Sequence, residues 1–181
     1  MQSIGVVLAG GRSRRMGTDK ALLPWGGSNL LAHQCETLQQ AGVDRIVVSG
    51  DYPEREAIAD RWPDIGPLGG VASVAEALPD AMLLLVPVDM PLLGVPLLRR
   101  LLAWPPDACA CFDREPLPMR LRLDARTRDT LARLREAPAG QRSLRALFDA
   151  LDGCRLDVTP EEARQLRDAD TPDAWRQLGT P

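Results

Sequence analysis

Residues 4–20 read IGVVLAGGRSRRMGTDK, and this stretch indicates the fold more strongly than any other part of the chain. Residues 4–8 form a short apolar run with β-branched side chains, which predicts a buried strand. Two glycines follow, and four cationic side chains then fall within nine residues: Arg12, Arg14, Arg15 and Lys20. Glycine lets backbone N–H groups approach an anion closely, and crowded cations repel one another unless an anion pairs with them. The stretch therefore predicts a loop that binds the polyphosphate of a nucleotide, with a basic surface loop as the alternative.

The spacing in this loop excludes two common nucleotide-binding motifs. Gly17 is followed by Thr18-Asp19-Lys20, so the Walker A pattern G-x-x-x-x-G-K-[ST] is absent, and so is the dinucleotide pattern G-x-G-x-x-G. Lys20 is the one lysine of a chain that has 21 arginines. A compact ammonium with rotatable donors suits a phosphate oxygen, so we expect Lys20 to contact the phosphates.

Asp89 follows the apolar run 83–88, at the expected carboxyl end of a buried strand. Burial penalises a carboxylate unless it is paired or binds a cation, and Mg²⁺ prefers one or two carboxylates together with phosphate oxygens. Ligands of parallel α/β sheets bind beyond the carboxyl ends of the strands. We therefore expect Asp89 and Lys20 to share one cavity. A structural turn between Pro87 and Pro91 is the alternative role for Asp89.

Strands and helices alternate along the first 112 residues. The pattern predicts strands at 45–49, 82–86 and 108–112, and helices at 29–41, 71–78 and 97–104. Such alternation is typical of an α/β fold with a mostly parallel central sheet.

The second half of the chain gives weaker patterns. We expect an edge strand at 116–123, because its two prolines suit an edge. Helices at 124–135 and 141–151 and a short strand at 154–158 follow, with helix starts at Thr159-Pro160 and at Asp170. We interpret the arginines between residues 120 and 135 as a solvated face.

The composition is that of a globular protein of one domain. The chain has 181 residues, a formal net charge of −3, 45% hydrophobic residues and 26% charged residues, and we expect a single domain over residues 1–181. No apolar run reaches the length of a membrane helix and the N-terminus lacks a secretory pattern, so we expect a cytoplasmic protein without membrane contact. The mild acidity argues against a nucleic-acid partner.

Histidine and cysteine usage excludes several chemistries. His33 is the single histidine, so a zinc site built on several histidines is excluded, and a Ser-His-Asp triad would have to use His33. Cys109 and Cys111 lie two residues apart, which fits small buried hydrophobic residues better than a metal-binding pair.

Four motifs together resemble one family. L-A-G-G-x-S-x-R-M-G-x-D-K at 8–20, G-P-L-G-G at 66–70, P-x-D-x-P at 87–91 and D-T-P at 170–172 are similar to the motifs of the molybdenum cofactor guanylyltransferases. The resemblance covers residues 4–178, with support from Pro116-Leu117 and from 140–144. It implies a three-layer α/β/α Rossmann-like nucleotidyltransferase fold with a mostly parallel central sheet.

The resemblance also implies an activity. The family transfers GMP from GTP to the terminal phosphate of molybdopterin, releases pyrophosphate, and uses Mg²⁺ as cofactor. Molybdoenzymes or cofactor-insertion proteins are the macromolecular partners that it implies.

The resemblance assigns nucleotide contacts residue by residue. It assigns binding of the guanine and ribose of GTP to three residues: Leu8, Ala9 and Gly10. The phosphates fall to Lys20 and to the backbone amides of Gly10 and Gly11, while Arg15 is expected to stabilise developing charge as a catalytic residue beside Lys20. Asp60 matches an acidic residue that recognises the nucleotide. Ser49 stands where relatives often have asparagine, and we expect a nucleotide contact there.

Further positions are assigned to metal and acceptor binding. Asp89 matches the Mg²⁺ ligand, and Gly69 and Gly70 belong to the expected substrate-binding turn. Asp168 and Asp170 stand where the family tends to have N-x-N-T-P, which assigns both to substrate binding. Asp170 is in addition either a second metal ligand or the cap of the last helix.

Other functions compete with this assignment. A molybdenum cofactor cytidylyltransferase usually has L-A-A-G, whereas Gly10 of this chain leaves more room beside a purine, although the segment 22–27 occurs in both groups. Sugar-phosphate nucleotidyltransferases are usually longer. A catalytically silent nucleotide-binding module would be expected to lack Lys20 or Asp89, and both are present. A scaffold that docks cofactor-maturation partners through the arginine-rich second half is the remaining alternative.

Overall fold

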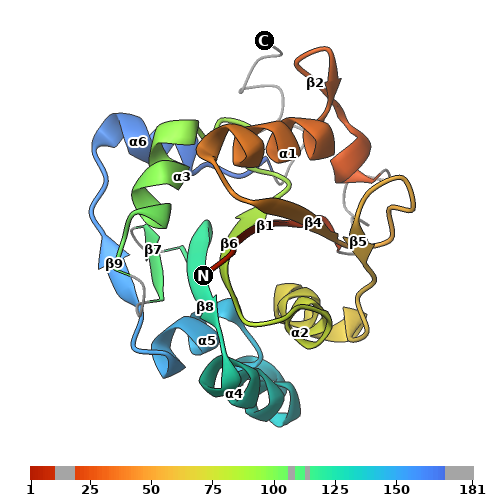
Figure 1. The fold of residues 1–181 in the computed structure, drawn as a ribbon, viewed down its shortest axis with the longest axis vertical. Helices are drawn as coiled ribbons and strands as arrows, with labels where there is room; N and C mark the ends of the chain where they lie inside the picture. The colour runs from red at the N-terminus through yellow and green to blue at the C-terminus, as the bar shows by residue number, and fades with distance from the viewer. Residues whose placement is uncertain (11–18, 106–108, 113–114, 170–181) are drawn as a thin grey trace.

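A seven-stranded sheet forms the centre of the computed structural model, which describes residues 1–10, 19–105, 109–112 and 115–169 (Figure 1). The strand order is β5-β4-β1-β6-β8-β7-β9. The strands span β1 Ser3–Leu8, β4 Arg45–Ser49, β5 Ala57–Ile58, β6 Ala81–Pro87, β7 Ala110–Phe112, β8 Met119–Leu123 and β9 Cys154–Leu156. Within this described sheet, β8 alone runs antiparallel to its neighbours. The predicted α/β fold with a mostly parallel sheet is therefore confirmed.

Helices cover both faces of the sheet and complete three layers (Figure 1). One face packs against α1 and α3, with α6 beside α3 on the same side, and the other face packs against α2, α4 and α5. The helices span α1 Leu30–Ala41, α2 Pro67–Ala77, α3 Val95–Leu102, α4 Ala125–Glu136, α5 Leu144–Ala150 and α6 Pro160–Gln165. Strand β1 contributes to both layers, because Ile4 and Val6 enter one apolar cluster while Val7 enters the other.

Short elements connect these layers. A hairpin of β2 Pro24–Trp25 and β3 Ser28–Asn29 precedes α1, and single 3₁₀ turns lie at Lys20–Leu22, Pro63–Ile65 and Ala139–Gln141. Within the described parts of the chain, no helix is long and apolar enough to cross a membrane.

Local signals set the helix ends. The Asn29 side chain accepts the N–H of Ala32 and starts α1, and Gly42 ends that helix with φ of 98°, a conformation that favours glycine. Thr159 and Glu162 form the capping box expected at the start of α6. Helix α2 starts at Pro67, earlier than predicted, because Gly66 adopts φ of 64° and Pro67 suits the first helical position.

The strand predicted at 116–123 is present as β8, but its predicted edge position is wrong, because β8 lies inside the sheet between β6 and β7. Both prolines precede the strand, which starts at Met119, so each residue of β8 keeps the N–H that an interior position needs. Arg120 is only 3% exposed and donates to the carbonyl of Pro105 at 2.8 Å, so this arginine does not belong to a solvated face.

Candidate active site

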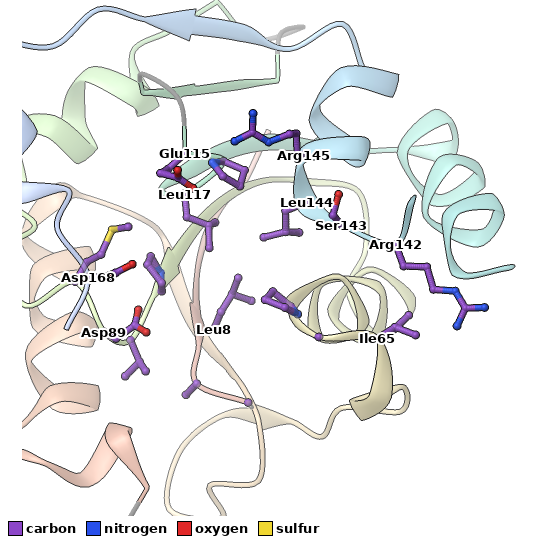
Figure 2. A pocket seen from close by; sticks show the side chains of 18 of the residues that line it. Leu8, Ile65, Asp89, Glu115, Leu117, Arg142, Ser143, Leu144, Arg145 and Asp168 are labelled. Atoms are coloured by element: carbon purple, nitrogen blue, oxygen red, sulfur yellow. The ribbon is translucent and has the colours of Figure 1, made fainter. Parts of the chain in front are cut away.

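A cavity of about 860 Å³ opens at the carboxyl ends of β1 and β6 (Figure 2). This is the sheet edge at which parallel α/β proteins bind ligands, and the volume suits a small-molecule substrate. Five segments supply most of its lining: 8–10 after β1, 64–67 before α2, 87–90 after β6, 115–117 before β8, and 142–145 at the start of α5.

Lys20 and Asp89 meet in this cavity. The Lys20 Nζ lies 3.3 Å from the Asp89 Oδ2, and their side chains are 13% and 22% exposed. Both residues line the cavity, as expected from the sequence. The pairing reduces the cost of placing either charge in a partly buried site, and it leaves both groups facing the space in which a ligand would bind.

Local hydrogen bonds place Lys20. The Asp19 carboxylate accepts the N–H of Ala21 at 3.0 Å and thereby starts the 3₁₀ turn that begins at Lys20. The turn packs against α1 through Ala21, which is fully buried. Lys20 therefore projects from an ordered turn.

Contacts from two directions hold the segment that carries Asp89. From α1, the Gln34 amide donates to the carbonyl of Met90 at 2.7 Å, and His33 Nε2 lies 2.9 Å from the carbonyl of Pro91. A carbonyl only accepts, so His33 is a structural donor here. The Ala169 N–H donates to the Asp89 carbonyl at 2.8 Å.

Asp168 lies at the same end of the cavity as Asp89 (Figure 2). The Ala169–Asp89 hydrogen bond brings the C-terminal segment to this position. Two carboxylates from distant parts of the chain thus line one region, and oxygen donors of this kind suit a hard divalent cation.

Ser49 lies outside the described cavity lining, and the nucleotide contact predicted for it stays a prediction. It is 1% exposed, and its carbonyl accepts the N–H groups of Ala9 at 3.1 Å and Gly10 at 2.7 Å. The Gly10 amide is therefore engaged within the protein and does not point to a ligand, contrary to expectation. What Gly10 contributes is a cavity wall without a side chain.

Gly69 and Gly70 are buried in the first turn of α2 and have packing roles there, and the substrate contacts predicted for them stay predictions. A Cβ on Gly69 would lie 2.1 Å from the Trp62 carbonyl oxygen, and one on Gly70 would lie 2.6 Å from the Ser49 Oγ. Glycine at these positions lets α2 approach the neighbouring backbone closely. The cavity wall beside them is formed by Gly66 and Pro67.

Asp60 also lies outside the cavity lining. Its Oδ1 accepts the N–H of Trp62 at 2.8 Å and the Ser73 hydroxyl at 3.3 Å, which shapes the segment that leads to the wall at 64–67. A direct contact between Asp60 and the nucleotide stays a prediction.

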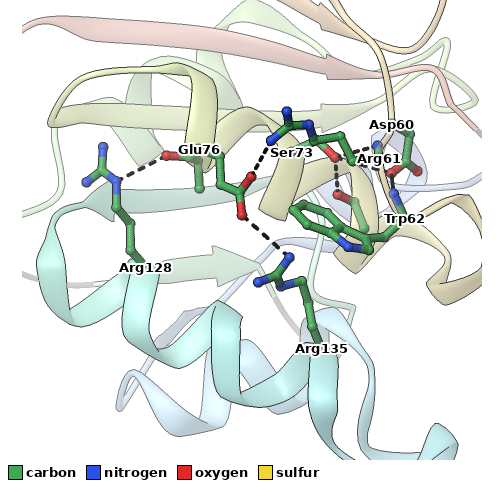
Figure 3. Close-up of polar contacts among 9 residues, drawn as sticks. Asp60, Arg61, Trp62, Ser73, Glu76, Arg128 and Arg135 are labelled. Carbon is green, nitrogen blue, oxygen red and sulfur yellow. Dashed lines mark hydrogen bonds and ion pairs between the residues drawn. The ribbon is translucent and has the colours of Figure 1, made fainter.

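A polar cluster that the sequence did not predict holds residues 61–62, which lead to the cavity wall at 64–67 (Figure 3). The Arg135 guanidinium lies 3.8 Å above the Trp62 ring, and it also lies 3.4 Å from the Glu76 carboxylate. Glu76 in turn pairs with Arg61 at 2.8 Å. The cluster joins residues 61–62 to α2 and α4, and no local sequence pattern could have paired residues this far apart.

The far wall of the cavity was also missed as a site. Glu115 and Leu117 precede β8, while Ser143, Leu144 and Arg145 begin α5. Figure 2 shows these two groups across the cavity from Leu8. Two short sequence matches, 116–117 and 140–144, were the available signal for this wall.

The two neighbouring cysteines are buried, as predicted. Cys109 and Cys111 are 5% and 0% exposed and belong to one apolar cluster. Burial raises the pKa of the Cys109 thiol to about 12 and that of Cys111 to about 11. Both thiols are therefore protonated at neutral pH and act as small hydrophobic side chains.

Three residues of the predicted site lie outside the described residues: Gly11, Arg15 and Asp170. Their expected roles in phosphate, transition-state and metal binding stay predictions.

Comparison with known proteins agrees with this geometry. Residues 5–154 match the MobA-like NTP transferase domain. A molybdenum cofactor guanylyltransferase of Xanthomonas euvesicatoria pv. vesicatoria is 51% identical over 175 residues, which cover 96% of this chain and 93% of that protein. A probable molybdenum cofactor guanylyltransferase of Chloroflexus aggregans is 36% identical and covers 96% and 91% of the two chains.

Solved structures agree on the fold. The crystal structure of molybdopterin-guanine dinucleotide biosynthesis protein A from Archaeoglobus fulgidus superposes with a TM-score of 0.73 over 96% of this chain and 95% of that one. At 20% identity this likeness supports the fold alone. The match over residues 5–154, together with the 51% identical relative, shows that the chain belongs to the MobA-like NTP transferase family.

Proposed function

We propose that the chain transfers GMP from GTP to the terminal phosphate of molybdopterin and releases pyrophosphate. The observation that carries this proposal is the contact of Lys20 with Asp89 in one cavity at the carboxyl ends of β1 and β6. The names of the 51% and 36% identical relatives supply the nucleotide and the acceptor.

GTP occupies the part of the cavity next to β1. Leu8, Ala9 and Gly10 line the space for its nucleoside, and Lys20 binds its phosphates. Among the described residues, the atom nearest to a Cβ on Gly10 would be the Ser49 carbonyl oxygen at 3.4 Å, an ordinary contact. Packing against the described residues therefore does not require glycine here, which supports a requirement for ligand space, as a purine base would impose.

Asp89 and Asp168 fit a divalent cation, which we take to be Mg²⁺. Their carboxylates are hard oxygen donors in one part of the cavity, and Mg²⁺ takes its remaining ligands from phosphates and water. When bound, the ion would neutralise phosphate charge.

The protein's own contribution to the reaction is positioning and charge. The acceptor phosphate is already an anion, so no side chain has to remove a proton from the nucleophile. Repulsion between two anionic substrates is the main obstacle, and Lys20 reduces it by binding phosphate oxygens. The Asp89 carboxylate pairs with the Lys20 ammonium and keeps it at the cavity wall.

The far wall binds the acceptor. Leu117 and Leu144 offer an apolar surface to a pterin ring, and Arg145 lies at the same wall as a cation for its phosphate. The cavity of about 860 Å³ is large enough for both substrates to meet between the two walls.

Pyrophosphate release tests the proposal. The protein is supplied with molybdopterin, Mg²⁺ and each nucleoside triphosphate in turn, and we expect release with GTP. Preference for CTP would overturn the base assignment. Binding of a nucleotide, measured by thermal shift, without release of pyrophosphate would identify a catalytically silent nucleotide-binding module.

A further inference from the structure

Tyr52 contacts both ends of the glycine-rich loop through one hydroxyl group. This oxygen lies 3.3 Å from the Ala9 carbonyl oxygen, at the end of β1, and 3.0 Å from the Asp19 Oδ2, next to Lys20. The second Asp19 oxygen lies 3.2 Å away. A single side chain from the segment after β4 thus lies against Ala9 and Asp19, the residues on either side of 10–18.

The hydroxyl is held as a donor. Carbonyl and carboxylate oxygens only accept, so the single phenolic proton is shared among these acceptors, and the Asp19 Oδ2 at 3.0 Å is the nearest. Burial, and then the hydrogen bond to Asp19, raise the pKa of Tyr52 well above its usual value, so the proton stays in place at working pH.

The ring is held in place as firmly as the hydroxyl. Tyr52 is 7% exposed and packs in the apolar cluster that contains Val7 and Ala21. A Cβ on Gly50 would lie 2.7 Å from the Tyr52 Cε2, and Gly50 adopts φ of 145°, so glycine there gives the ring its space. Tyr52 is therefore a fixed point to which the loop ends are attached.

We propose that Tyr52 is a positioning residue that holds Ala9 and Asp19 together, so that Lys20 is in place before the nucleotide binds. This inference rests on the proposed function, because it assigns Lys20 to the phosphates of GTP. Asp19 transmits the effect, since the carboxylate that accepts from Tyr52 also starts the turn of Lys20.

The expected effect is on nucleotide affinity. Without the hydroxyl, Ala9 and Asp19 are held together in only a fraction of the molecules. The apparent affinity for GTP falls in proportion to that fraction, because only those molecules have Lys20 in place. Bound GTP restores the arrangement through its own contacts, so turnover at saturation changes little. Because a hydrogen bond to a charged group is lost, we expect the affinity for GTP to fall about tenfold.

Tyr52→Phe in the full chain tests the inference, because it keeps the ring and removes the hydroxyl. We expect the Kd and the KM for GTP, with Mg²⁺ present, to rise about tenfold while kcat stays within about twofold. Thr130→Val is the matched control. It removes another buried hydroxyl, which donates to the Arg126 carbonyl at 2.8 Å on α4, away from the cavity.

A purely structural role would give a different result. Fewer folded molecules would lower kcat and leave KM unchanged, and that outcome, like an unchanged KM and kcat, overturns the inference. Asp19→Ala removes the acceptor of the same hydrogen bond. Adding Tyr52→Phe to it is expected to raise the Kd by about twofold or less, and additive effects of the two substitutions would overturn the inference.

The wild-type protein separates this inference from the proposed function. If it releases no pyrophosphate from GTP, the proposed function fails. The ratio of the Kd values of Tyr52→Phe and wild type for GTP still decides whether Tyr52 positions the loop.

Discussion

Replacing Lys20 with methionine removes the ammonium from the cavity while keeping most of the side-chain length. At 3.3 Å and an effective dielectric constant of about 20, the attraction between Lys20 and Asp89 is about 5 kcal/mol before desolvation is considered. Because the side chains are only 13% and 22% exposed, lost hydration offsets most of this attraction. We expect the free energy of unfolding to fall by about 1–2 kcal/mol, which lowers Tm by about 3–6 °C.

The effect on catalysis is expected to be larger than the effect on stability. A preorganised donor that stabilises phosphate charge contributes about 10²–10³-fold to the rate, so kcat/KM for GTP should fall by that factor. Steady-state pyrophosphate release and thermal unfolding of the same preparation measure the two effects separately.

Arg126→Met is the matched control for Lys20→Met. Arg126 pairs with Asp152 at 2.7 Å, but these side chains are 60% and 85% exposed, so the pair contributes at most about 1 kcal/mol. Activity should not change in this variant. A kcat/KM of Lys20→Met within about threefold of wild type would refute the assignment of Lys20 to the phosphates.

Three further predictions follow from the same structure. Asp89→Asn should abolish the dependence of GTP affinity on Mg²⁺ concentration and lower turnover at least about 10²-fold; an unchanged metal titration would contradict the metal assignment. Gly69→Ala should lower the free energy of unfolding by about 1–3 kcal/mol, because its Cβ would lie 2.1 Å from the Trp62 carbonyl oxygen. Gly140→Ala is its control, because an added Cβ there would have no non-neighbouring atom of the described residues within 4 Å, and equal denaturation midpoints would show that the contact at Gly69 is unimportant. Since the pKa of Cys109 is raised from 9.0 to about 12 by burial, the stability that the buried thiol contributes is complete below pH 9 and is lost as pH rises toward 12. The free energy of unfolding, measured by urea denaturation at pH 8 and at pH 10, should therefore fall less for Cys109→Ala than for wild type. An equal fall in both proteins would contradict this.

The sequence was sufficient for those features that depend on neighbouring residues. The apolar run before the glycines predicted β1, and Asn29 and Gly42 marked the ends of α1 within one residue. The capping box of Thr159 and Glu162 was correct for the same reason, since a cap forms with residues three positions away. Even the shared cavity of Lys20 and Asp89 was predictable, because carboxyl ends of parallel strands meet at one sheet edge.

Position in the sheet and close approach between distant segments were decided by the tertiary structure. Two prolines suggested an edge strand, yet β8 is interior, because strand order depends on pairing with β6 and β7 and not on the residues that precede the strand. The sequence also could not show that Ser49 lies next to Gly70, where an added Cβ would lie 2.6 Å from the Ser49 Oγ.

The sequence by itself determined the fold class and the shared cavity of Lys20 and Asp89, for which it predicts phosphate binding. The tertiary structure decided which other residues position these two and complete the cavity. Tyr52 joins the ends of the loop, Arg135 supports Trp62, and the start of α5 completes the cavity. Local patterns report interactions over a few residues, whereas these contacts exist only after folding has brought together segments that the chain places tens of residues apart.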